Sequence, residues 1–194
     1  MSPKKTVIFI GSSVCKGTGA TELYGWSRML DARLTAEGWT CEHTSIGGQD
    51  TGDILLRLGR DVIDRHPDCC IVGLGLANEG LKKTQTPEEA ECVRAVFDAN
   101  MRKIISALQK ADIAVACGGV YPNNRYNGFQ YETLKKEEAL SASWGVPVFS
   151  WLSALDDGQG HFREGLYHDA GHPSDEGYRV MYECIPEKIF ESEK

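Results

Sequence analysis

An aspartate and a histidine near the C-terminus have a spacing that suits proton transfer. Asp169 and His172 are three residues apart in the stretch HDAGHPSDEGY, which begins at His168. On a short turn, a carboxylate can hold one nitrogen of an imidazole and leave the other nitrogen free to act as a base. The alternative is that polar residues simply gather on a loop. If the pair is functional, a nucleophile is expected elsewhere in the chain.

The stretch GSSVCKGTGAT, beginning at Gly11, allows three interpretations. Ser12 or Ser13 on a tight turn is a candidate nucleophile. A flavodoxin-like loop that binds a phosphate, such as that of FMN, through Thr18–Thr21 is the second. The third is a turn without chemistry. A Walker-type loop is excluded, because the lysine of this stretch precedes its glycine instead of following it.

Two further stretches offer hydrogen-bond donors. Gly47 and Gly48 in SIGGQDTGD can leave a backbone N–H free, or can form a helix-entry turn with positive φ. Asn78 in LGLANEG carries an uncharged amide donor, or is a turn former. A serine, a glycine N–H and an asparagine amide, together with Asp-x-x-His, are the groups that acyl transfer requires. Their combination favours chemistry over the structural alternatives.

Strand-like and helix-like stretches alternate along the chain and would bring these residues together. Five such alternations predict an α/β fold, a doubly wound parallel sheet with helices on both faces. Ligands of such sheets bind beyond the carboxyl ends of the strands. The expected strands are Thr6–Ile10, Trp39–Ile46, Cys69–Leu76, Ile113–Cys117 and Val146–Ser150. The expected helices are Leu23–Gly38, one from Thr51 or Asp53, Pro87–Lys110, Tyr131–Trp144, and one capped by Ser174 that runs to about Phe190.

Bulk composition limits the classes of partner. The 194 residues carry a net charge of −7, so a nucleic acid or an anionic membrane surface is not expected to bind. The length and the lack of a composition break predict one domain over residues 1–194. No stretch approaches the roughly 18 apolar residues of a membrane span. The sequence leaves the oligomeric state open.

The N-terminus and the cysteines bear on the cellular compartment. The apolar run after the first lysines has only five residues, fewer than the roughly 7–15 of a signal-peptide core. The seven cysteines include no C-x-x-C pair, which favours reduced thiols over a disulfide framework or a zinc site. We therefore expect a cytoplasmic protein, although secretion with a leader that is later removed stays open.

Over nearly its whole length, the chain resembles the SGNH (GDSL-like) hydrolase family. That family has a Gly-Asp-Ser block, a glycine block, a Gly-x-Asn block and a C-terminal Asp-x-x-His-Pro block. The resemblance implies a three-layer α/β/α sandwich with a five-stranded parallel sheet, flavodoxin-like in outline. It also implies that Ser13, His172 and Asp169 form a catalytic triad, and that the Ser13 N–H, Gly48 and Asn78 form the oxyanion hole.

The chain departs from the family pattern in three places. Ser12 replaces the usual aspartate of the first block, which supports the active-site turn but makes no bond to substrate. The second block lacks the usual asparagine. Its oxyanion donor is assigned to Gly48, and Gly47 is the alternative. Glu79 stands where many members have aspartate. A hydrolase fold kept as an inactive scaffold is therefore one alternative, and a flavodoxin-like binding module for FMN or another phosphate is a second.

The resemblance implies hydrolysis of an ester without cofactor or metal. The compact length favours short acyl groups, acetyl above all. The loop GVYPNNRYNGF (Gly118–Phe129) has aromatic and amide groups that suit a sugar ring, or it is simply a turn. A small-molecule or carbohydrate ester is therefore the expected substrate.

Two other kinds of chemistry are weighed against this reading. A metal site is a possible role for the side chains of His161, His168, His172 and Asp169. The glycine and proline beside His172 argue against the helix that such a site would use. Cys15 is a second candidate nucleophile, although a small buried thiol is the commoner role for such a residue.

Overall fold

A computed structural model describes residues 5–190 of the chain. Five parallel strands form one sheet in the order β2-β1-β3-β4-β5. This confirms the predicted five-stranded parallel sheet and places the polar second strand at an edge. The strands are β1 (Thr6–Gly11), β2 (Thr40–His43), β3 (Cys69–Gly73), β4 (Ala114–Gly118) and β5 (Val148–Phe149).

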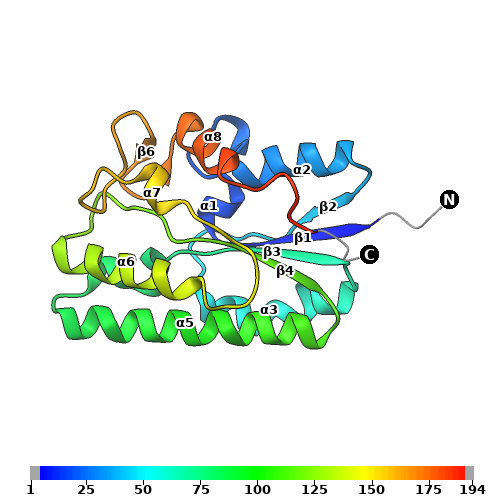
Figure 1. Cartoon of the computed structure of the whole chain (residues 1–194), viewed down its shortest axis with the longest axis horizontal. Helices are drawn as coiled ribbons and strands as arrows, with labels where there is room; N and C mark the ends of the chain where they lie inside the picture. The colour runs from blue at the N-terminus through cyan, green and yellow to red at the C-terminus, as the bar shows by residue number, and fades with distance from the viewer. Residues whose placement is uncertain (1–4, 191–194) are drawn as a thin grey trace.

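Helices cover both faces of the sheet and complete three layers (Figure 1). On one face lie α3 (Thr51–Asp61), α5 (Pro87–Lys110) and α6 (Gly128–Ser141). On the other lie α1 (Ser13–Lys16), α2 (Trp26–Ala36) and α8 (Asp175–Glu183). The shorter elements are α4 (Leu76–Glu79), α7 (Leu152–Leu155) and the 3₁₀ turns η1 (Thr21–Leu23), η2 (Ile63–Arg65) and η3 (Leu81–Lys83).

The first strand shows how the sheet separates two cores. Successive side chains of a strand point to opposite faces, so Ile8 and Ile10 pack with α3 and α5 while Val7 and Phe9 pack with α2 and α8. All four side chains are almost fully buried. Burial on both faces explains why this strand is a continuous apolar run instead of an alternating one.

Several element boundaries differ from the sequence-based expectation. The third strand ends at Gly73, and Leu76–Glu79 forms a helix instead of extending that strand. The helix expected at Tyr131–Trp144 begins earlier, at Gly128, because Asn127 and Gln130 form a capping box. The last helix ends at Glu183, well before Phe190, since a proline follows soon after.

The stretch that carries Asp169 and His172 is a hairpin, where a loop was expected. β6 (Tyr167–Asp169) and β7 (His172–Pro173) pair in antiparallel fashion, and Asp169 lies opposite His172. The hairpin leads directly into α8, so it is held at the same edge of the sheet as the N-terminus of α1 (Figure 1). The two residues are therefore fixed relative to each other by strand pairing.

Two sequence-based expectations concern the chain ends and membranes. The first four residues, part of the stretch considered for a leader, lie outside the described residues, as do the last four of the domain predicted over 1–194. Within residues 5–190, no helix combines the length and the apolar character needed to cross a bilayer.

Candidate active site

Ser13, His172 and Asp169 form a continuous chain of hydrogen bonds. The Oγ of Ser13 lies 3.0 Å from Nε2 of His172. On the far side of the ring, Nδ1 of His172 lies 2.9 Å from each carboxylate oxygen of Asp169. The serine and the histidine are 159 residues apart in sequence, and the fold alone brings them together. The geometry allows the imidazole to accept a proton from the serine while the carboxylate holds the opposite nitrogen.

The hairpin turn fixes the carboxylate of Asp169. Its Oδ1 accepts hydrogen bonds from the backbone N–H of Gly171 at 2.7 Å and from that of His172 at 3.0 Å. Partial burial acts to raise the pKa of Asp169, but these N–H groups and the imidazole of His172 outweigh burial, and the pKa lies below its ordinary value. The carboxylate therefore remains charged beside the imidazole.

Close backbone packing positions the turn that carries Ser13. The turn follows β1, where Gly11 pairs with Gly73 of β3. A Cβ on Gly11 would come within 2.1 Å of the Gly73 carbonyl oxygen, so only glycine fits there. The next residue, Ser12, donates its N–H to the same carbonyl at 3.1 Å. Ser13 is then the first residue of α1, with its hydroxyl at the carboxyl edge of the sheet.

The two other candidate nucleophiles of this turn are buried. Ser12 is 1% exposed, and its Oγ has no hydrogen-bond partner among residues 5–190. Cys15 is fully packed in the core, and burial raises the pKa of its thiol to about 12. A thiol with this pKa stays protonated near neutral pH and is a poor nucleophile. Of the three candidates, Ser13 is the one whose hydroxyl meets both the cavity and a base.

The loop considered for phosphate binding is tied to the last helix instead. Thr21 donates from its N–H at 2.7 Å and from its hydroxyl at 2.6 Å to the carboxylate of Asp175. The hydroxyl of Tyr178 donates to the carbonyl of Thr18 at 2.6 Å. A phosphate at Thr18–Thr21 would have to displace a carboxylate that already occupies these donors and would repel it. The arrangement disfavours the flavodoxin-like interpretation.

Asn78, a predicted oxyanion donor, lies on the cavity wall. It belongs to the short helix α4, and its Nδ2 donates to the carbonyl of Gln49 at 3.1 Å. A primary amide nitrogen carries two N–H groups, so one N–H remains for a ligand. This contact also ties α4 to the loop that carries the predicted glycine donor.

The two glycines of the second block are placed differently. The backbone of this loop continues beside β1, where the N–H of Ile46 donates to the carbonyl of Gly11 at 3.0 Å. A Cβ on Gly47 would lie 3.7 Å from Cβ of Ser13. Gly48 has φ of +82°, is exposed and is not among the residues lining the cavity. The turn thus reaches the serine, while the choice of Gly48 over Gly47 as donor stays a prediction.

A buried arginine is hydrogen-bonded to the loop that carries Gly47 and Gly48. Arg57 of α3 donates to the side chain of Gln49 at 2.7 Å and to the carbonyl of Thr44 at 2.8 Å. Its charge is balanced by Asp61 at 2.8 Å. The position of the glycine turn therefore depends on α3 as well as on β1.

The catalytic candidates surround a cavity of about 210 Å³. Sequence reasoning identified the hydrogen-bonded residues and the loop Gly118–Phe129, but it missed Ala77 and Lys82. Lys82 is followed by Lys83 in the sequence, and an adjacent pair of lysines does not by itself indicate a cavity. The lining residues are Ser13, Ala77, Asn78, Lys82, Tyr121, Asn123, Arg125, Asp169, Gly171 and His172.

The loop Gly118–Phe129 has both of the roles that its sequence allowed. Tyr121, Asn123 and Arg125 face the cavity. Asn124 has a structural role, because its Oδ1 accepts the N–H of Phe162 at 2.8 Å. Tyr126 is buried in the core. Alternate residues thus serve the site and the packing.

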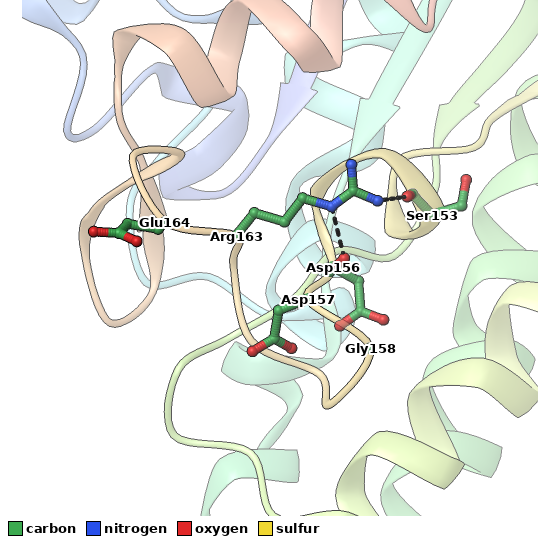
Figure 2. A pocket seen from close by; sticks show the side chains of 6 residues that line it. All are labelled: Ser153, Asp156, Asp157, Gly158, Arg163 and Glu164. Carbon is green, nitrogen blue, oxygen red and sulfur yellow. Dashed lines mark hydrogen bonds between the residues drawn. The ribbon is translucent and has the colours of Figure 1, made fainter.

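A second hollow lies beside α7, and its residues serve the loop that forms it (Figure 2). Arg163 donates to the carbonyls of Asp156 and Ser153, each at 2.9 Å, and so fastens the loop to the helix. The other residues that line the hollow are Asp157, Gly158 and Glu164, and none of them is a nucleophile held by a base. This hollow does not resemble a catalytic centre.

The histidines considered for a metal do not converge. Nε2 of His161 lies 2.9 Å from the carbonyl oxygen of Tyr126, and His172 is engaged by Ser13 and Asp169. No group of three or more His, Cys, Asp or Glu side chains suited to a metal gathers in the described part of the chain.

Comparison with known proteins identifies the family of the chain. Residues 9–180 match the model of the GDSL-like lipase/acylhydrolase family. No curated protein matches the sequence. Among solved structures, the chain is similar to Axe2, an acetylxylan esterase from Geobacillus stearothermophilus, with 18% identity and a TM-score of 0.72 over 96% of this chain and 95% of that one.

Two further solved structures have the same fold. A GDSL-like lipase from Bacteroides thetaiotaomicron is 19% identical, with a TM-score of 0.70 over 95% of this chain and 87% of that one. A lipase/acylhydrolase from Enterococcus faecalis is 18% identical, with a TM-score of 0.68 over 93% of each chain. Identities this low establish a shared fold, whereas the family match covers most of the chain. The protein therefore belongs to the GDSL-like lipase/acylhydrolase family and is an ester-bond hydrolase.

Proposed function

We propose that the protein is a serine esterase that removes short acyl groups, acetyl above all, from small-molecule or carbohydrate esters. The observation that carries this proposal is the unbroken sequence of contacts from Ser13 through His172 to Asp169 at the wall of a cavity. His172 takes the serine proton as Oγ attacks the ester carbonyl, and Asp169 stabilises the imidazolium that forms.

The rest of the cycle follows from the same groups. The tetrahedral oxyanion accepts hydrogen bonds from the N–H of Ser13, from the remaining amide N–H of Asn78 and from the N–H of Gly48. His172 then returns its proton to the leaving alcohol, which leaves an acyl-enzyme on Ser13. Water activated by the same imidazole hydrolyses that ester and regenerates the free serine.

The cavity supports a short acyl group. Its volume of about 210 Å³ is below the roughly 300–1,000 Å³ typical of drug-sized ligand sites. Eight of its ten lining residues have polar or charged side chains, and Ala77 and the ring of Tyr121 add apolar surface. A long acyl chain would have little apolar surface to bury, whereas an acetyl group needs little. The polar wall suits a hydroxylated alcohol such as a sugar.

The test compares two neighbouring serines. Ser13→Ala is expected to abolish hydrolysis of para-nitrophenyl acetate and labelling by a fluorophosphonate, whereas Ser12→Ala is expected to keep most of both. Mass spectrometry should map the label to Ser13. An inactive Ser12→Ala variant with an active Ser13→Ala variant would show that the nucleophile is wrongly assigned. Failure of the wild type to label or turn over would favour the inactive scaffold.

Acyl preference is tested separately. The ratio kcat/KM should fall along para-nitrophenyl acetate, butyrate and octanoate, and acetylated oligosaccharides should release acetate. A rise toward octanoate would contradict the short-acyl proposal while leaving the triad intact.

A further inference from the structure

Two cationic side chains on the cavity wall have no partner. Lys82 of η3 is half-buried, and Arg125 is exposed in the loop after β4. Neither side chain makes an ion pair or hydrogen bond with any residue in the range 5–190. Other arginines behave differently, since Arg57, Arg94 and Arg102 each contact a carboxylate. Because both cations line one cavity, their positive charge is available to an anionic ligand there.

A buried amide at the same wall also lacks a partner for its donor end. Asn123 is 2% exposed, and its Oδ1 accepts the backbone N–H of Arg125 at 3.1 Å. This bond fixes the amide, so that Nδ2 is the end left for the cavity. Nδ2 has no acceptor among the described residues. The amide N–H groups of Asn123 are therefore available to a ligand or a water in the cavity.

The donor end of Asn123 lies beside the catalytic hairpin. A Cβ on Gly171 would come within 3.3 Å of Nδ2, and Gly171 is the residue before His172. The amide therefore lies near the histidine that holds Ser13, on the same cavity wall as both cations. The three groups offer only donors to a ligand.

The acids near the cavity are already engaged. Asp169 is the one acid among the lining residues, and its oxygens accept from Gly171 and His172. Glu79, on the same short helix as Asn78, accepts the N–H and the hydroxyl of Thr51. Neither acid forms an ion pair with Lys82 or Arg125.

We propose that the cavity selects esters that carry an anionic group, a carboxylate or a phosphate, near the ester carbonyl, and that Lys82, Arg125 and Asn123 bind that group. This rests on the proposed esterase function and adds the charge of its substrate. A guanidinium and an ammonium, together with an amide N–H, form charge-assisted hydrogen bonds to the oxygens of such groups. The three residues determine specificity and take no part in the proton transfers.

The experiment measures the charge preference of the wild type with matched esters. Para-acetoxybenzoate is compared with its neutral methyl ester, and para-acetoxyphenyl phosphate tests phosphate on the alcohol side. Para-nitrophenyl hemisuccinate, whose acyl group carries a carboxylate, is compared with para-nitrophenyl butyrate, whose acyl group is neutral. Each enzymatic ratio of kcat/KM is divided by the ratio for hydroxide-catalysed hydrolysis, which removes differences in intrinsic reactivity. A corrected ratio above one, falling in about 0.5 M NaCl, is expected for at least one pair.

Variants identify the residues responsible. Lys82→Ala and Arg125→Ala should each lower the anionic-to-neutral ratio about twofold to fivefold, the range of partly exposed charge pairs. The double variant Lys82→Glu/Arg125→Glu should lower the anionic-to-neutral ratio by about tenfold or more, because the introduced carboxylates repel an anionic substrate. Asn123→Asp should also lower the ratio, because it keeps the acceptor for Arg125 N–H and replaces the donor by an acceptor. Lys83→Ala is the matched control, because Lys83 is exposed, next in sequence and absent from the cavity wall.

The outcomes separate this proposal from the proposed function. If the wild type hydrolyses neutral acetates but no pair shows a charge preference, the anion proposal is overturned and the esterase stands. Equal losses on charged and neutral esters in the Lys82 and Arg125 variants overturn it as well, as does an equal effect of Lys83→Ala. If no ester is hydrolysed and Ser13 is not labelled by the fluorophosphonate, the proposed function fails and the anion proposal falls with it.

Discussion

The carboxylate of Asp169 offers a sharp test because its side chain is 51% exposed. Each oxygen lies 2.9 Å from Nδ1 of His172. At this distance, Coulomb's law gives about 1.4 kcal/mol at the dielectric of water and about 6 kcal/mol at an effective dielectric of 20. The half-exposed position places the attraction toward the middle of this range, about 3 kcal/mol, or roughly 10² in rate. We expect Asp169→Ala to lower kcat by about that factor, because water can reach Nδ1 in place of the carboxylate.

Asp169→Asn should be worse than Asp169→Ala. The asparagine oxygen can keep the N–H of Gly171, which leaves the amide nitrogen facing Nδ1 of His172. The imidazole must then accept at Nδ1 and carry its proton on Nε2, where it can no longer receive the serine proton. We expect a loss of about 10³–10⁴, the size known for the wrong tautomer in serine proteases.

The assay is hydrolysis of para-nitrophenyl acetate, with and without added formate. Formate can enter the space vacated in Asp169→Ala and restore at least about tenfold of the activity. It cannot do so in Asp169→Asn, where the amide fills that space. Thermal unfolding of both variants controls for loss of the hairpin, since Oδ1 also binds the N–H groups of Gly171 and His172. Equal activity of the two folded variants, or rescue of both by formate, would refute the reasoning.

Two further predictions concern rate and stability. Asn78→Ala removes the proposed oxyanion donor and should lower kcat by about 10²–10³ with a smaller change in KM; a fall in kcat of less than about threefold would exclude this role. Glu137 has a side chain with 0% exposure whose Oε1 has no partner among the described residues, and burial raises its pKa from 4.5 to about 7. Because the folded state then binds more protons than the unfolded state, stability should fall as pH rises between about 4.5 and 7. Glu137→Gln should therefore raise the free energy of unfolding at pH 8 by up to about 3 kcal/mol. The substitution removes the ion pair between Glu137 and Arg94, but Arg94 still has a carboxylate partner in Glu91 at 2.6 Å. Urea titrations at pH 5 and pH 8 measure this, and a variant less stable than wild type at pH 8 contradicts it.

The alternation of apolar runs was enough to predict the sheet and its layers. The first strand was predicted from its continuous apolar run, and the helix Pro87–Lys110 from the proline at its start. The fold class also predicted that Asn78, Asp169, His172 and one of the two serines Ser12 and Ser13 gather at one edge of the sheet, and the family resemblance selected Ser13. Their contacts could then be expected before any distance was known.

The remaining features depend on long-range contacts that local patterns do not contain. The third strand stops at Gly73 and a helix begins at Leu76, although Leu74 and Leu76 continue the apolar character of the strand. The hairpin at Asp169 has only short, polar strands, for which strand propensity gives no signal. Lys82 reaches the cavity through the packing of η3, and no periodicity in its own segment indicates that position.

The separation of Ser13 from His172 has a consequence for biogenesis. A ribosome makes the nucleophile 159 residues before it makes the base. A nascent chain therefore exposes a serine with no more reactivity than any other alcohol until the C-terminal hairpin docks. The onset of turnover then marks the moment at which these two distant segments have met, so activity reports on a late stage of folding.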